Sequence, residues 1–165
     1  MDSHEGDEYF LIAFNERPQV LLDGTRDGTS VVDRLSIAEP HGATALYDAC
    51  YLGVEKLTTS SYAKHALLLI SDGEDNNSRY MLDQVRKLLR ESDVTVYSIG
   101  IADLINLTGK AGARARAALE GIEGMTGGRA FYPSSGAGMD ATFEQIAIEL
   151  PVFPGLPSAK FRCRR

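Results

Sequence analysis

The sequence predicts an α/β fold, a mostly parallel sheet with helices on both faces and one antiparallel hairpin at an edge. Two segments, 65–71 (HALLLIS) and 94–102 (VTVYSIGIA), are apolar along nearly their whole length rather than at alternate positions. Such strands are typical of a parallel sheet covered on both sides. Segments with helical spacing alternate with them, which indicates a Rossmann-like arrangement. The side chains expected to be buried in these strands are Leu67, Leu69, Val96 and Ile99.

Length and composition are those of one compact domain. The chain has 165 residues, of which 44% are hydrophobic and 24% charged, enough apolar side chains for a real core. The formal net charge of −6 argues against a general nucleic-acid or anionic-membrane binder, because such proteins need a surplus of Lys and Arg. No apolar run approaches the roughly 20 residues of a membrane span, and residues 1–10 lack the pattern of a secretory signal. The compartment is left open.

Only two cysteines occur, Cys50 and Cys163, and neither has a CxxC partner. This excludes a zinc knuckle and a disulfide scaffold. Cys50 lies within a helical pattern and is interpreted as a small core residue.

The first third of the chain is predicted to hold a hairpin and two helices. Apolar runs at 8–14 (EYFLIAF) and 19–22 (QVLL) flank the turn-forming segment NERP, which indicates an antiparallel hairpin. Helical spacing then runs through 30–38 until the segment EPHGAT interrupts it. It resumes at 44–57 (TALYDACYLGVEKL).

The rest of the chain alternates strands and helices. The predicted elements are strand 65–71, helix 79–92, strand 94–102, helix 110–125, strand 129–133 and helix 141–150. We therefore place one domain at 1–150. Residues 151–165 are rich in Pro and basic residues without periodicity, and are interpreted as an unpacked end or linker.

Three carboxylates, Asp72, Glu74 and Asp75, follow the apolar strand 65–71 directly. Ligands bind beyond the carboxyl ends of parallel strands, and half-buried negative charge is costly unless a cation or hydrogen-bond donors lie opposite. Asp72 is therefore expected on the functional edge of the sheet, opposite a positive group or hydrogen-bond donors, with capping of a turn or helix as the simpler alternative. Glu74 and Asp75 are interpreted as solvated acids at the start of the following helix. Asp48 is expected to bond nearby backbone or face water.

Four segments, in this order and spacing, resemble a von Willebrand factor type A domain, most closely its bacterial branch. They are GATALYDA (42–49), LLLISDGEDN (67–76), VTVYSIGIA (94–102) and MTGGRAFY (125–132). The resemblance runs from about residue 8 to residue 150. It implies a divalent cation, usually magnesium, held by Thr44 and Asp72 together with an Asp-x-Ser-x-Ser segment, and a protein partner that binds through an acidic side chain. The local sequence fits Thr44 equally well as the N-cap of the helix that follows.

The sequence departs from this family near its start. Asp-x-Ser-x-Ser occurs nowhere, and in MDSHEGD His4 stands where the first serine should be. Residues 8–14 resemble the family's second strand, so we expect a truncated domain that lacks the central first strand. One carboxylate and one hydroxyl are a partial shell for magnesium, so binding by this chain is expected to be weak or absent. Two apolar strand edges, at 8–14 and 65–71, would then pair directly or cause self-association.

Two other functions stay open on the sequence alone. A hydrolase or phosphotransferase could use Asp72 as a nucleophile, but it would need a base, a phosphate cradle or a Lys partner. The three histidines, His4, His41 and His65, are scattered, and only His41 lies near a functional loop. The glycines of TGGR lack the Lys-Ser/Thr pair of a phosphate loop and indicate a helix stop and a tight turn. We expect no catalysis. The remaining alternative is a non-binding structural fragment of a larger protein.

Overall fold

The structure, a computed structural model, describes residues 8–36, 42–101 and 109–149 and divides the chain into two compact units. We call Phe14–Pro18 together with His41–Tyr132 the sheet unit. The other segments, Met1–Ala13, Gln19–Pro40 and Pro133–Arg165, make up the terminal unit. The predicted tail at 151–165 lies outside the described residues.

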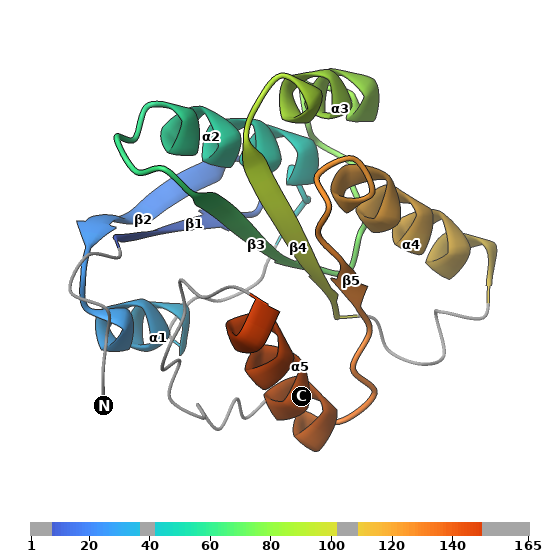
Figure 1. Ribbon diagram of the computed structural model, residues 1–165. Helices are drawn as coiled ribbons and strands as arrows, with labels where there is room; N and C mark the ends of the chain where they lie inside the picture. The colour runs from blue at the N-terminus through green and yellow to red at the C-terminus, as the bar shows by residue number, and fades with distance from the viewer. Residues whose placement is uncertain (1–7, 37–41, 102–108, 150–165) are drawn as a thin grey trace. The chain divides into compact units, whose positions relative to one another are not determined.

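The sheet unit is built on three parallel strands, β3 (His65–Ser71), β4 (Val94–Gly100) and β5 (Ala130–Phe131), in the order β3-β4-β5 (Figure 1). β3 and β4 pair along their whole lengths. β5 is a two-residue edge strand that lies opposite Ser98 and Ile99. The parallel sheet that the continuous apolar runs predict is confirmed.

Three helices, α2 (Leu46–Thr58), α3 (Leu82–Arg90) and α4 (Lys110–Glu123), form a layer against this sheet (Figure 1). α2 contacts β3, α4 contacts β4 and β5, and α3 packs against both other helices. Each helix turns an apolar stripe toward the strands, which is why the sequence shows their helical period so clearly. The buried side chains of this core are Leu46, Cys50, Val54, Leu69, Val85, Leu89, Val94, Val96, Leu119 and Ile122.

Three of the four strand side chains expected to be buried are buried. Leu69 is 4% exposed, and Val96 and Ile99 are 0% exposed. Leu67 is only partly buried, so the prediction is wrong for this residue, although its side chain packs against the core. The reason is its position in β3, an edge strand that pairs on one side only, with β4, in the described three-stranded sheet.

The terminal unit contains most of an antiparallel hairpin and two helices. β1 (Tyr9–Phe14) and β2 (Pro18–Thr25) form the predicted hairpin, and the residues of its turn belong to the sheet unit. α1 (Gly28–Ser36) follows the hairpin, and α5 (Gly136–Glu149) ends the described chain. None of the helices within the described ranges is long and apolar enough to cross a membrane.

Several elements differ from their predicted bounds. The helix predicted at 79–92 begins at Leu82, because Met81 has an extended backbone (φ −101°, ψ 157°) and is the N-cap. The strand predicted at 129–133 is confined to Ala130–Phe131. The last helix begins at Gly136, ahead of the predicted start at residue 141. The other elements overlap their predicted ranges.

Two architectural expectations concern both units. The described strands form two separate sheets, and no ladder joins β1 to β3 in this part of the chain. Direct pairing of segments 8–14 and 65–71 is therefore not found, while association through their edges stays a prediction. Helices α1 and α5 belong to the terminal unit, so a second helical layer on the parallel sheet also stays a prediction.

Candidate functional site

Asp72 follows the last residue of β3 and lies at the carboxyl edge of the sheet, as the sequence predicts. Its side chain is exposed, and its Oδ1 accepts a hydrogen bond from the backbone N–H of Glu74 (3.0 Å). Between them, Gly73 has φ +81°, and a Cβ there would lie 2.5 Å from the carbonyl oxygen of Ala115. The tight turn thus requires glycine. Asp72 caps this turn with one carboxylate oxygen.

Thr44 is tied to the loop that follows β3 by three hydrogen bonds. Its backbone N–H donates to Oδ1 of Asn76 (2.8 Å), and its carbonyl oxygen accepts from the backbone N–H groups of Asn76 (3.0 Å) and Asn77 (3.1 Å). All three bonds leave the threonine side chain free, and its hydroxyl has no hydrogen-bond partner within the described residues. The loops of the two predicted ligands are therefore held together by their backbones.

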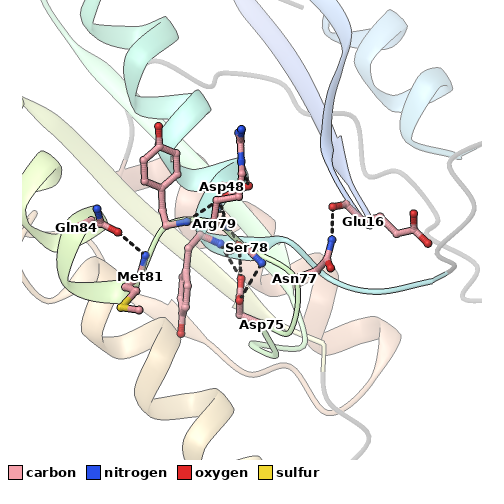
Figure 2. Close-up of polar contacts among 10 residues, drawn as sticks. Glu16, Asp48, Asp75, Asn77, Ser78, Arg79, Met81 and Gln84 are labelled. Carbon is pink, nitrogen blue, oxygen red and sulfur yellow. Dashed lines mark hydrogen bonds and ion pairs between the residues drawn. The ribbon is translucent and has the colours of Figure 1, made fainter.

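The first turn of α2 is capped by the loop after β3 rather than by a residue next to it in sequence. Oδ2 of Asp75 accepts a hydrogen bond from the backbone N–H of Tyr47 (3.1 Å), and the Ser78 hydroxyl accepts from the backbone N–H of Asp48 (3.1 Å). The Ser78 hydroxyl also donates to Asp75, so the two capping side chains support each other (Figure 2). Two otherwise unpaired helix N–H groups are satisfied in this way.

These contacts correct two interpretations. Thr44 is not the N-cap of α2, because Ala45 occupies that position and no side chain adjacent in sequence caps the helix. Asp75 is not a solvated acid at the start of α3, since it is half-buried at the start of α2. A carboxylate is favourable at a helix N-terminus, but the fold decides which helix receives it. Glu74 is exposed, as predicted, but it is not at the start of the following helix, which begins at Leu82.

Asp48 is buried, with 5% exposure, and its carboxylate organises the second half of the loop. Oδ1 accepts hydrogen bonds from the backbone N–H groups of Arg79 (2.9 Å) and Tyr80 (3.0 Å), and Oδ2 pairs with Nε of Arg79 at 3.2 Å (Figure 2). The Tyr80 ring stacks on that of Tyr51, with centroids 3.9 Å apart. The prediction that Asp48 bonds backbone is confirmed, but this backbone is distant in sequence rather than nearby.

A third segment joins this arrangement. Nδ2 of Asn77 donates to the carbonyl oxygen of Glu16 (2.6 Å) (Figure 2). The backbone N–H of Ala45 donates to the carbonyl oxygen of Asn15 (2.8 Å). Segments 14–18, 42–48 and 72–80 thus form one hydrogen-bonded cluster, which we call the loop cluster.

Cys50 lies behind the loop cluster in the core and is 1% exposed. Burial raises the pKa of its thiol to about 12, and the charge of Asp75 adds to this effect. Because only the thiolate is reactive, Cys50 is inert at neutral pH, in agreement with its interpretation as a core residue.

The oxygens at the carboxyl edge suit a hard cation but are too few to enclose one. Magnesium takes six oxygen ligands and keeps several waters. Hydrogen bonds hold the Thr44 loop and the Asp72 loop together. The atoms these loops could offer to a cation are the Thr44 hydroxyl and Oδ2 of Asp72. Among the described residues, no group of three or more His, Cys, Asp or Glu could hold a metal. Thr44 and Asp72 therefore fit magnesium only as part of a larger ligand set.

Among the described residues, no histidine lies near Asp72 to act as its base. His65 is the first residue of β3, whereas Asp72 follows its last residue. Six residues of strand lie between the two and keep them about 20 Å apart. His4 and His41 lie outside the described residues.

The fold and the loop cluster define an α/β domain with a polar, preorganised edge at the carboxyl end of its parallel strands. The family model for the von Willebrand factor type A domain matches residues 2–145, so this chain belongs to that family. The family is often used for protein interaction and adhesion, and its members are generally not enzymes.

Solved structures share this fold at low sequence identity. The conserved hypothetical protein BatB from Bacteroides thetaiotaomicron is 19% identical, with a TM-score of 0.62 over 90% of this chain and 80% of that one. A von Willebrand factor type A protein from Catenulispora acidiphila is 17% identical, with a TM-score of 0.63 over 86% and 33% of the two chains. Proximal thread matrix protein 1 from the mussel byssus is 14% identical, with a TM-score of 0.58 over 87% and 35%. No curated protein matches this chain.

Sequence reasoning missed the roles of Asn76 and Ser78. The pair Asp75 and Ser78 has the composition of a helix cap, but the local pattern assigns it to the helix that follows in sequence. Only the fold shows that it caps α2.

Proposed function

We propose that this chain is a protein-interaction domain that binds its partner at the carboxyl edge of β3, with Thr44 and Asp72 contributing to an incomplete site for magnesium or another divalent cation. The observation that supports this most is the set of three hydrogen bonds between Thr44 and the loop after Asp72. They hold the two loops together without using the Thr44 hydroxyl or the second carboxylate oxygen of Asp72.

The chemistry of the partner follows from that of the cation. A magnesium ion held by few protein oxygens keeps open positions, and a carboxylate is a ligand it prefers. The partner would therefore present an acidic side chain to the site. The role of the protein is to orient Thr44 and Asp72. No step of bond breaking is proposed.

The test is thermal unfolding of the chain in magnesium and in a chelator. A ligand that prefers the folded state raises its melting temperature. With so few protein oxygens we expect millimolar affinity or weaker, as an order of magnitude, and a shift of at most about 5 °C at about 20 mM magnesium. Asp72→Asn and Thr44→Val should each remove the shift. Asparagine can still cap the turn and valine has the shape of threonine, so neither should lower stability much in chelator.

The matched control is Glu74→Gln, which removes one exposed negative charge two residues from Asp72 and should leave the magnesium shift intact. Asp75 is unsuitable as a control because it caps α2. If the wild-type curves coincide in magnesium and chelator, or if Glu74→Gln behaves like Asp72→Asn, the cation site is wrong. The alternative function, a non-binding structural fragment of a larger protein, is then favoured.

A further inference from the structure

A second buried carboxyl group lies at the C-terminal end of α4, outside the segments of the loop cluster. Glu123 is the last residue of α4 and is only 6% exposed. Its Oε2 is buried and has no hydrogen-bond partner among the described residues. The hydroxyl of Ser98, on β4, is likewise buried and unpartnered. Two unsatisfied polar atoms in one region are unusual, because each costs free energy unless it finds a partner.

The surroundings of Glu123 disfavour a negative charge. The carboxyl stands at the C-terminal end of α4, where the helix dipole is negative, and the last turn of the helix contains no basic residue. Burial raises the pKa of Glu123 to about 7, and Glu120 adds to the rise. The polar groups of Ser98 and Ala130 lie close enough to oppose this rise in part, although neither is within hydrogen-bonding geometry of Oε2. The carboxyl group therefore gains or loses its proton near neutral pH.

The segment that connects Glu123 to the edge strand β5 is joined to β4 by hydrogen bonds from Val96 and Ser98. The Glu123 carbonyl oxygen accepts hydrogen bonds from the backbone N–H (2.8 Å) and hydroxyl (2.9 Å) of Thr126, whose hydroxyl accepts from Val96 N–H (2.9 Å). Farther along, Ser98 N–H donates to the carbonyl oxygen of Arg129 (3.0 Å). β5 itself has two residues. Such a short edge segment is the part of the sheet that opens at the lowest cost.

We propose that Glu123 and Ser98 form a proton-dependent latch between the C-terminal end of α4 and the segment 124–131. With the proton bound, the neutral carboxyl donates to the Ser98 hydroxyl, and the segment lies closed on β4. When the proton is lost, the buried carboxylate has to be hydrated, and water reaches it as the segment detaches from β4.

The other charged groups near Glu123 do not neutralise it. Glu120, on the same helix, adds negative charge, and Tyr132, after β5, is kept neutral because burial raises its pKa. Arg86 on α3 is engaged by the carbonyl oxygen of Gly121 (3.1 Å) and by Asp83 (3.3 Å). β4 contributes the uncharged Ser98.

The latch is tested by amide hydrogen exchange, read as protection factors at pH 5 and pH 7.5. The reporters are the amides of Ser98 and Val96, which donate to Arg129 and Thr126 in the closed segment. A pKa of about 7 against an ordinary 4.5 predicts that their protection falls at least about tenfold between these pH values. In Glu123→Gln, which mimics the protonated group, the fall should be less than about twofold. The amide of Ile101, which donates to Ser71 between β4 and β3, is the internal control.

Glu120→Gln, one turn earlier and exposed, is the matched variant and should keep most of the fall seen in the wild type. The three histidines are common to all variants and do not affect the comparison. A pH-independent protection of Ser98 in the wild type, or an equal fall in Glu123→Gln, would overturn the latch. If Glu123→Gln does not fold, the carboxyl ¹³C resonance of Glu123 in the wild type decides. A midpoint at about pH 6 or above supports the proposal, and one below about pH 5 overturns it.

Discussion

Asp48 and Glu123 are two carboxylates with nearly equal burial and opposite surroundings. Asp48 is 5% exposed, and Glu123 is 6% exposed. The Asp48 carboxylate accepts two backbone hydrogen bonds and one from the Arg79 guanidinium, whereas one oxygen of Glu123 has no partner in the described residues. Asp48 lies in the first turn of α2 and Glu123 at the last residue of α4, so the helix dipole favours the first charge and opposes the second.

This difference teaches that burial alone does not decide what an acidic residue does. Where donors converge on it, as at Asp48, the carboxylate acts as the fixed point around which a loop is built. Where donors are missing, as at Glu123, the same group becomes sensitive to pH. The loop cluster should therefore be rigid across the neutral pH range, while the segment after α4 should not.

The largest expected effect comes from exchanging each carboxylate for its amide. Asp48→Asn should destabilise the protein by about 2 kcal/mol at both pH 5 and pH 8, because an uncharged amide is a weaker acceptor for Arg79 and the loop backbone. Urea unfolding at the two pH values measures this. Glu55→Gln, at an exposed position on the same helix, is the control and should change little.

Glu123→Gln should have the opposite sign. The pKa of Glu123 is raised from 4.5 to about 7 in the folded protein, so the wild type loses stability as pH rises through this window. The amide variant does not titrate, so at pH 8 it should be more stable than the wild type by about 1 to 2 kcal/mol, and nearly equal to it at pH 5. If Asp48→Asn and Glu123→Gln destabilise the protein equally at pH 8, the proposed difference between the two buried carboxylates is wrong.

A smaller effect is expected at Asp75, which sharpens the account of the loop cluster. Asp75→Asn should lower the free energy of unfolding by about 1 kcal/mol, because the carboxylate caps Tyr47 of α2 and accepts from Ser78. Glu74→Gln, the neighbouring exposed acid, should be neutral within error in the same urea titration. Equal effects at the two positions would mean that the cap contributes nothing.

The smallest expected effect is association through the edge of β3. β3 is an edge strand in the described sheet, and unpaired edges of apolar strands recruit other strands. We therefore expect a weak dimer whose fraction rises with concentration in sedimentation velocity. A single monomeric species over the whole accessible concentration range would contradict this.

Much of the fold could be predicted from the sequence. The unbroken apolar runs of β3 and β4 predict a parallel sheet. Parallel sheets are typically covered on both faces, so side chains on both sides of each strand are apolar. The position of Asp72 after such a strand follows from the same pattern. The roles of Asp75 and Ser78 could not be predicted, since the helix they cap precedes them in the chain and local patterns refer to the helix that follows.

The sequence by itself determined the alternation of strands and helices and the position of Asp72 directly after a strand, because these depend on the periodicity of apolar residues. The tertiary structure alone decided which donors meet each buried acid. Asp48 and Arg79 are 31 residues apart in the chain, yet they form an ion pair, whereas the buried Oε2 of Glu123 finds no donor among the described residues. Hydrogen bonds act over about 3 Å, so the character of a buried charge depends on distances that only the folded chain defines.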